Sequence, residues 1–245
     1  MSLKRKSSAE GSEEARKEAK TRRTDAVYND EGADVVLVSS DIVVFRVYGY
    51  FIQAASPVFR TMLQVGNKEP SAEVEFTDGK LERAAIIRLL LNFICKPFDG
   101  FDMLGTDNAL DLIRLADKWD FGNLLSSIKL QIEHPICPGL PAHRYGRFFY
   151  ACALDDVEAA HRLFLEMGTK RWTTVKEMAE ATVDDMIKGA PVLDLTTMSS
   201  EWIDRLPRKY FLALLQATGL LPDSPAGWTA VADEFKMQVK LQDAK

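Results

Sequence analysis

Two β-branched runs separated by only three polar residues constrain the fold of this chain more than any other feature. Val35–Val38 and Ile42–Val47 are rich in residues that favour strands, and Ser39, Ser40 and Asp41 lie between them. Such a short polar connection predicts a β-hairpin. A helical pattern follows at once, so the chain must combine a small sheet with helices from its first ordered segment.

The segments after the hairpin alternate between helix and strand signals. Tyr50–Ala55 predicts a short helix, and Ser56 and Pro57 supply an N-cap and a first helical residue for a second helix that ends at Leu63. Ala72–Phe76 alternates apolar and charged residues, which predicts a third, half-exposed strand. We expect Phe59 and Leu63, four residues apart on one helix face, to pack inward as structural anchors.

The rest of the chain carries helical patterns. Leu81–Cys95, Asn108–Trp119 and Leu124–Ile132 repeat apolar residues at helical spacing, and a proline-dense break at 134–141 follows them. Beyond the break we expect further helices, with the stretch after Pro222 too polar to place: Ala142–Leu154, Val157–Gly168, Thr174–Lys188 and one or two helices in Ser199–Thr218. The sequence therefore predicts an α+β fold, with a tail at 1–28, an α+β domain at 30–134 and an all-helical extension at 142–245.

The first 28 residues are rich in Ser, Glu, Lys and Arg and offer almost nothing to bury. Such a segment cannot offset the entropy of ordering, so we expect a disordered tail. Its charged start lacks the apolar stretch of a secretory signal. Two basic clusters in it are typical of a nuclear-import signal, which predicts a nuclear location, or otherwise a cytoplasmic one. The proposed import residues are Lys4, Arg5, Lys6, Lys20, Arg22 and Arg23.

Composition excludes several classes of protein. No apolar run approaches the roughly 18 residues of a membrane span, so no membrane partner is expected. The net charge of −5 gives no general reason for direct nucleic-acid binding. Cys95, Cys137 and Cys152 lie far apart without a Cys-x-x-Cys spacing, which disfavours a disulfide framework and a zinc site.

Candidate catalytic groups are few. Cys137 and Cys152 could pair with a histidine in a cryptic Cys/His hydrolase, but His134, His143 and His161 match no catalytic or metal-binding motif. No glycine-rich phosphate loop precedes a Lys-Ser or Lys-Thr pair, so no nucleotide site is expected. We therefore predict no catalytic residue, no metal and no cofactor.

Two further sets of residues have a structural explanation. Asp155-Asp156 and Asp184-Asp185 resemble paired catalytic carboxylates, but neighbours on a helix point about 100° apart, so helix capping is the better interpretation. Trp172, Trp202 and Trp228 could anchor an interface, but we expect them in the core.

The order of elements and several sequence strings resemble the BTB/POZ family. Asp34–Val38 is similar to its first strand and Ile42–Phe45 to its second. Phe51–Leu63 resembles its apolar helix, Ser-x-x-Phe cap and Met-Leu ending. Leu89–Cys95 matches an apolar helix that ends in an aromatic and a short turn, and Leu110–Trp119 resembles its Leu-x-x-Ala-Asp-Lys-aromatic helix. The resemblance covers about two fifths of the chain, and the remainder is similar to the helical extensions of fungal members.

The resemblance implies a small sheet of about three strands with a cluster of helices, and the function of a non-enzymatic adaptor that binds other proteins. It also implies a homodimer, and we expect the exposed apolar side chains of the first helix to favour one. An unidentified protein partner would be held by the extension or by a groove. The predicted dimer contacts are Val35, Tyr50, Phe51 and Ile52.

Two departures from the family pattern bear on function. Tyr48-Gly49 stands where the family has a histidine and a basic residue, so Asp34 is not expected to form the charged pair of transcription-factor members. Members that recruit a cullin-3 ubiquitin ligase usually carry an apolar-x-Glu motif near the third helix, but Ala84–Phe93 has no acidic residue. A nuclear regulator is the preferred interpretation, and a cullin-3 substrate adaptor is the alternative.

Overall fold

A computed structural model of the chain describes residues 22–66, 72–96, 104–133, 141–168, 200–218 and 227–243, together with residues 193, 195 and 198. The strands within this part are β1 (Arg23–Asn29), β2 (Val35–Val38), β3 (Val43–Val47) and β4 (Ala72–Glu75). The helices are α1 (Gly49–Ala55), α2 (Pro57–Gly66), α3 (Ala84–Cys95), α4 (Thr106–Lys118), α5 (Gly122–Glu133), α6 (Pro141–Ala153), α7 (Val157–Gly168), α8 (Ser200–Arg205), α9 (Arg208–Thr218) and α10 (Trp228–Asp243). The α+β prediction is confirmed.

The sheet has the strand order β1-β3-β2-β4, and the predicted hairpin is its centre. β2 and β3 pair antiparallel, with Leu37 opposite Phe45, while β4 pairs parallel to β2. The inward-facing side chains of Leu37 and Phe45 are buried, because strand residues alternate between the two faces and one face packs on the helices. The hairpin turn is tied to α3, since the Asp41 carboxylate accepts a hydrogen bond from the Ala84 amide at 2.7 Å.

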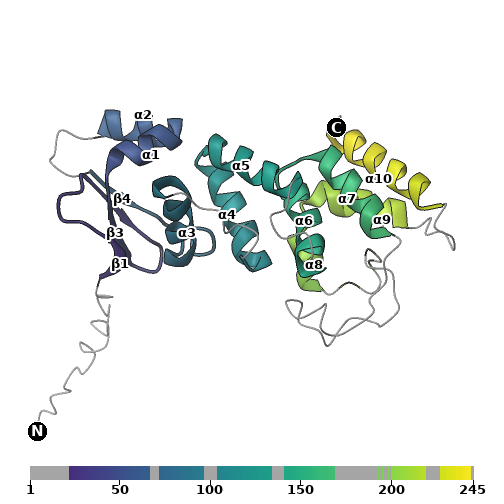
Figure 1. Cartoon of the computed structure of the whole chain (residues 1–245), viewed down its shortest axis with the longest axis horizontal. Helices are drawn as coiled ribbons and strands as arrows, with labels where there is room; N and C mark the ends of the chain where they lie inside the picture. The colour runs from purple at the N-terminus through teal and green to yellow at the C-terminus, as the bar shows by residue number, and fades with distance from the viewer. Residues whose placement is uncertain are drawn as a thin grey trace, which may run out of the picture.

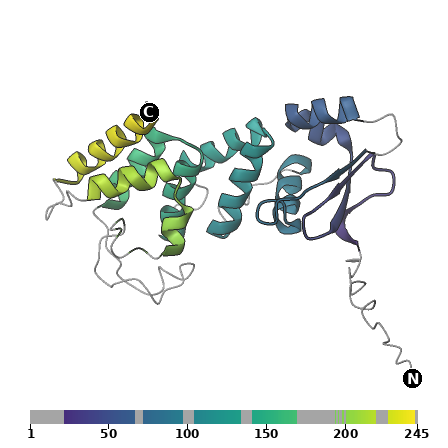
Figure 2. The same ribbon diagram turned by 180° about the vertical axis from the view of Figure 1, so that it is seen from behind.

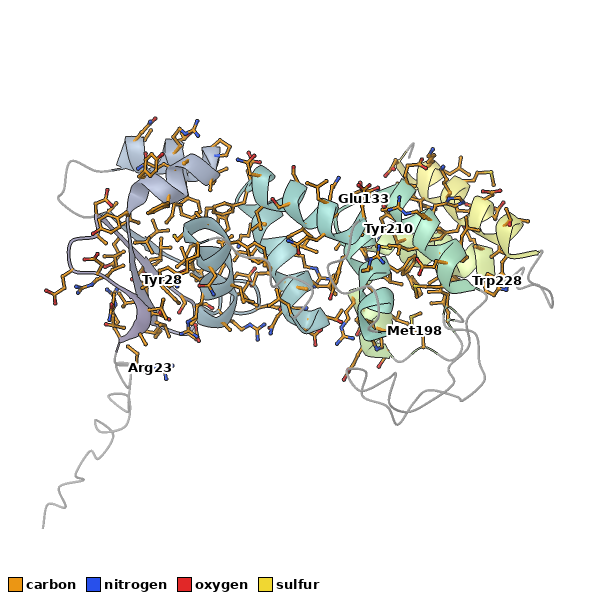
Figure 3. The ribbon with its side chains drawn as sticks, in the orientation of Figure 1. Arg23, Tyr28, Glu133, Met198, Tyr210 and Trp228 are labelled. Atoms are coloured by element: carbon orange, nitrogen blue, oxygen red, sulfur yellow. The ribbon has the colours of Figure 1, made fainter. Side chains whose placement is uncertain are left out.

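Strand β1 corrects the expected tail, because residues 23–28 belong to the sheet. β1 runs parallel to β3, and its buried Asp25 accepts hydrogen bonds from the amides of Val27 and Tyr28 and from Arg88 of α3. Burial alone would raise the pKa of Asp25, but these donors hold it below the ordinary value. The Tyr28 hydroxyl donates to Asn92 Oδ1 at 2.8 Å, one helical turn after Arg88. Figure 3 shows Tyr28 and Arg23 on this strand.

The helices of the first half close the core beneath the sheet. Phe59 of α2 is 1% exposed and packs against the rings of Phe76, Trp119 and Phe121 at centroid distances of 5.1 to 6.3 Å. Leu63 is partly buried and packs against the same core. The prediction that Phe59 and Leu63 are structural anchors is therefore confirmed.

The second half is helical as far as the structure describes it, and it continues the first half. α6 packs against α4 and α5, and one hydrophobic core runs from Phe45 in the sheet to Phe235 in α10. The sheet lies at one end of the molecule and α10 at the other (Figures 1 and 2). No described helix is long and apolar enough to cross a membrane.

The predicted helices of this half mostly have matching elements. α6 and α7 begin and end within one residue of the expected ranges, and Ser199–Thr218 contains both α8 and α9. The helix expected at Thr174–Lys188 lies outside the described residues. The polar stretch after Pro222, which the sequence left unplaced, contains α10.

Candidate interaction surface

Helices α1 and α2 carry exposed apolar side chains at the sheet end of the molecule (Figure 1). Tyr50 is 75% exposed, and Phe51 and Val58 are each 38% exposed. The rings of Tyr50 and Phe51 meet edge to face with their centroids 5.7 Å apart. We call these three residues the α1/α2 surface. Exposed aromatic side chains next to each other are typical of protein-binding surfaces.

The structure divides the four predicted dimer contacts into two pairs. Tyr50 and Phe51 are exposed, but Val35 and Ile52 are 2% and 1% exposed. Val35 points to the inner face of the sheet, and Ile52 is on the side of α1 that packs against the core. The prediction is corrected for Val35 and Ile52, because buried side chains offer no surface to a second copy.

The position of α1 depends on Asp34 and Gly49. Asp34 Oδ1 accepts a hydrogen bond from the Gly49 amide at 2.7 Å, which satisfies a free N–H at the start of α1. A Cβ atom on residue 49 would lie 2.9 Å from Val35 Cγ2, so a larger residue would force a shift. Asp34 therefore binds the first backbone amide of α1.

Tyr48 ties the start of α1 to the turn after β1. Its hydroxyl donates a hydrogen bond to Asp30 Oδ2 at 2.7 Å, and Asp30 Oδ1 accepts the Gly32 amide. These two donors hold the pKa of Asp30 below its ordinary value. The Tyr48-Gly49 pair thus has a structural role: Gly49 allows the close approach of α1, and Tyr48 holds the neighbouring turn.

The junction between α1 and α2 is held by a buried serine. Ser56 Oγ donates to the Trp119 carbonyl oxygen at 2.6 Å and accepts the Phe59 amide at 3.1 Å. The second bond is the predicted N-cap of α2. Because the first bond reaches the end of α4, the α1/α2 surface is rigidly connected to the core.

A buried carboxylate, Glu82, binds the side chains of Lys118 and Trp119 at the end of α4. Glu82 is 1% exposed and accepts hydrogen bonds from the amides of Thr77 and Asp78 and from Trp119 Nε1 at 3.0 Å. Lys118 Nζ lies 2.8 Å from Glu82 Oε1. Burial alone would raise the pKa of Glu82, but Lys118 and the hydrogen-bond donors hold it below its ordinary value. This cluster joins the segment between β4 and α3 to the end of α4.

An open apolar groove lies beside the α1/α2 surface. It measures about 330 Å³ and is formed by the end of α1, the end of α3 and the start of α5. Its lining is mainly apolar, with Phe51 shared between the groove and the α1/α2 surface. The other lining residues include Ala54, Phe93, Ile94, Leu124 and Ser127. We call it the α1/α3/α5 groove.

A second, larger cleft of about 570 Å³ separates α4 from α8 and is lined mainly by charged residues. Arg205 of α8 binds Asp107 of α4 through two hydrogen bonds of 2.7 and 2.8 Å. Arg114 of α4 donates to the Arg205 carbonyl oxygen at 3.1 Å and pairs with Asp111, which also binds Arg83. These contacts join the first half of the molecule to the second.

Of the proposed import residues, only Arg22 and Arg23 lie within the described part of the chain. Arg22 binds Glu73 Oε1 at 2.9 Å and Glu75 Oε1 at 2.6 Å, both on strand β4. Arg23 begins β1, and its amide donates to the Ile42 carbonyl oxygen. Lys4, Arg5, Lys6 and Lys20 lie outside the described residues. The structure thus brings Arg22 to the sheet and does not test the signal itself.

The hydrolase hypothesis gains no support from the residues that can be placed. Cys152 is buried in α6, and burial raises the pKa of its thiol well above the ordinary value. His161 Nε2 lies 3.0 Å from Asp233 at the surface between α7 and α10. Cys137, His134 and the side chain of His143 lie outside the description. Among the described side chains, no group of three His, Cys, Asp or Glu residues could hold a metal ion.

Paired aspartates and tryptophans have structural roles wherever the structure describes them. Asp156 Oδ1 accepts the Ala159 amide at the start of α7, which confirms the predicted cap. Trp202 and Trp228 are 3% and 7% exposed, so both belong to the core as predicted. Trp172 and Asp184-Asp185 lie outside the described residues.

A comparison with known families gives a match over the first half of the molecule. Residues 26–134 match the family model described as BTB/POZ domain. The match begins within β1 and ends at the start of the proline-dense break, which confirms the resemblance noted for the hairpin, α1, α2 and α4. No curated protein matches the chain.

Proposed function

We propose, from the premise that residues 26–134 of this chain are a BTB/POZ domain, that the protein is an adaptor that pairs with a second copy through its α1/α2 surface. A BTB/POZ domain supports a role in protein–protein interaction. The helical extension and the α1/α3/α5 groove would then hold other partners. The proposal assigns no catalytic step to any residue.

The exposure of Tyr50, at 75%, carries the dimer proposal. An aromatic side chain is large and rotates about only two bonds, so ordering it at an interface costs little entropy for the apolar area that it buries. Phe51 and Val58 extend the same apolar surface, and the Ser56 and Asp34 hydrogen bonds hold their helices in place. A preorganised apolar surface is what a stable two-fold contact needs.

A pair of substitutions tests this contact. Tyr50→Glu/Val58→Glu should place four charges in a two-fold interface and convert a dimer to a monomer in light scattering. Leu130→Glu is the matched control, because Leu130 of α5 is 59% exposed but lies outside the α1/α2 surface. An unchanged mass for the double variant, with its melting temperature preserved, would contradict the proposal.

The nuclear role is a finer proposal that rests on the basic tail. Replacing Lys4, Arg5, Lys6 and Lys20 by Ala should move a large fluorescent fusion from nucleus to cytoplasm, because an import receptor recognises the charges. Arg22→Ala in the same fusion tests whether Arg22, which binds Glu73 and Glu75, also contributes to import. Nuclear accumulation of the fourfold variant would show that these residues are not the signal.

The α1/α3/α5 groove favours a second candidate function, that of a substrate adaptor for a cullin-3 ubiquitin ligase. An apolar groove between helices accepts the apolar face of a partner helix. Ala54 is exposed within the groove, so Ala54→Glu should block such a helix without disturbing the core. Capture of the cullin-3 N-terminal region by the intact chain, and its loss in Ala54→Glu, would support this function. Failure of the intact chain to capture cullin-3 would reject it.

A further inference from the structure

A second set of large apolar side chains is exposed at the other end of the molecule. Met237 and Leu241 of α10 are each 47% exposed, while Phe235 and Val239 on the opposite face are fully buried. Residues four apart lie on one face of a helix, so Met237 and Leu241 form a continuous apolar stripe. Leu215 on the adjacent α9 is 50% exposed and extends the apolar character of this region.

Two opposite charges lie beside this stripe in a symmetrical arrangement. Asp233 and Lys240 are seven residues apart, nearly two helical turns, so they share one flank of α10. Met237 lies close to the midpoint between them. The side chains of Asp233 and Lys240 remain 66% and 58% exposed, although Asp233 contacts His161 and Lys240 contacts Glu158.

This pattern is complementary to itself under a two-fold axis. If two α10 helices pack antiparallel with the axis near Met237, Asp233 of each copy lies beside Lys240 of the other. Parallel packing would instead bring like charges together. We propose that the exposed face of α10 binds the α10 of a second copy of this chain. A partner of strongly basic or acidic character would match only one of the two charges.

The α10 contact must be weak when it acts alone. A stable interface typically covers about 800 Å² on each partner, more than a stripe of half-exposed side chains supplies. Figures 1 and 2 show α10 at the opposite end of the molecule from α1 and α2. A dimer joined through the α1/α2 surface would therefore present two α10 faces, and linked contacts are strengthened by their high effective concentration. The resulting linear assembly rests on the proposed function, whereas the α10 contact itself does not.

The first test measures the mass of the intact chain by light scattering over a concentration series. The wild-type mass should rise above that of a dimer, and Met237→Glu/Leu241→Glu should hold it at the dimer, with association weakened at least tenfold. Leu130→Glu should behave as wild type. Equal mass profiles for the wild type and the α10 variant would overturn the inference, whereas a wild-type dimer that becomes a monomer in the α10 variant would support it and overturn the α1/α2 contact instead.

The second test uses charge reversal, with the melting temperature of each variant measured in parallel because Asp233 and Lys240 also contact His161 and Glu158 within the chain. Asp233→Lys and Lys240→Glu should each weaken association, because each places like charges side by side. The combined variant restores opposite charges across the axis and should recover wild-type association at low salt. Failure of this rescue in a folded protein would overturn the inference.

Variants of the α1/α2 surface show which proposal fails if one does. Tyr50→Glu/Val58→Glu alone should still pair at high concentration, and adding Met237→Glu should abolish that pairing. Persistent pairing after all three substitutions would overturn the α10 contact. If Tyr50→Glu/Val58→Glu abolishes all pairing and Met237→Glu has no further effect, the α10 contact is also overturned. The proposal of a dimer through the α1/α2 surface would then still hold.

Discussion

Different kinds of contact stabilise the interior of the BTB/POZ domain and the interior of the helical extension. In the domain, buried side chains such as Asp25, Ser56 and Glu82 accept hydrogen bonds from backbone amides. In the extension, buried aromatic rings contact one another between helices, as where Phe164 stacks on Phe235 with centroids 4.9 Å apart. Figure 3 shows Tyr210 and Trp228 within this half. Hydrogen bonds from buried side chains to the backbone fix a particular backbone conformation. Contacts between aromatic rings allow a wider choice of residues on the packed helices.

The family match at residues 26–134 covers the half in which buried side chains bind backbone amides in this way. A serine that caps a helix or a glutamate that binds two amides has few chemical substitutes, so these positions restrict the residue type strongly. Aromatic packing needs only a suitable volume on the correct helix face. Helix packing therefore constrains the sequence of the extension less tightly.

The largest expected effect compares one core residue from each half. Phe59→Ala and Phe235→Ala should each lower the free energy of unfolding by about 3–5 kcal/mol, because both rings are buried. Since one hydrophobic core joins the halves, both variants should shift the same calorimetric transition. Two separate transitions, with each variant moving only its own, would show that the extension is an independent domain.

A smaller effect on the free energy of unfolding is expected from the buried carboxylate of Glu82. Glu82→Gln removes the charge that binds Lys118 and should cost about 1.5–3 kcal/mol near neutral pH. Because the folded pKa of Glu82 lies below its unfolded value, its contribution is fully present above about pH 4.3 and falls as the pH drops through the folded pKa. Thermal melts from neutral pH into acid should therefore show the wild type and Glu82→Gln converging. A constant difference across this range would contradict the role of the charge.

Gly49→Ala should destabilise the domain by about 1–3 kcal/mol, since the new methyl group would press on Val35. Asp34→Asn is the companion variant: it keeps an acceptor for the Gly49 amide and should cost less. Chemical denaturation of both variants checks the order. Equal stability of Gly49→Ala and the wild type would show that α1 can move away from β2 freely.

The smallest effect belongs to Arg22. Its contacts with Glu73 and Glu75 are exposed to solvent, so Arg22→Ala should leave the melting temperature nearly unchanged. A large fall in melting temperature would mean that Arg22 is a structural part of the sheet. Polar side-chain contacts on the outer surface of the domain would then stabilise it as well as those in its interior.

The hairpin, α1, α2 and α4 could be predicted because their signals are local. Strand β1 could not, since only Asp25 and Tyr28 point inward and a buried aspartate is satisfied only once Arg88 is near. α10 was not predicted either. Its buried residues have helical spacing, but the charged residues between them make the apolar periodicity hard to recognise in the sequence.

The exposure of the four predicted contact residues was only half predictable for a related reason. Tyr50, Phe51 and Ile52 are neighbours in the sequence, and which of them faces the core depends on how α1 lies on the sheet. Val35 belongs to an inner sheet face that the pairing of β2 with β3 defines. A run of apolar residues predicts that an interface is near, and tertiary packing decides which side chains remain exposed.

The dimer proposal can be judged from the mass of Met237→Glu/Leu241→Glu, in which α10 no longer contributes. At micromolar concentrations, light scattering of this intact chain should give twice the chain mass of 27.5 kDa, because the α1/α2 surface is unchanged. A mass of 27.5 kDa over the same range would contradict pairing through Tyr50, Phe51 and Val58.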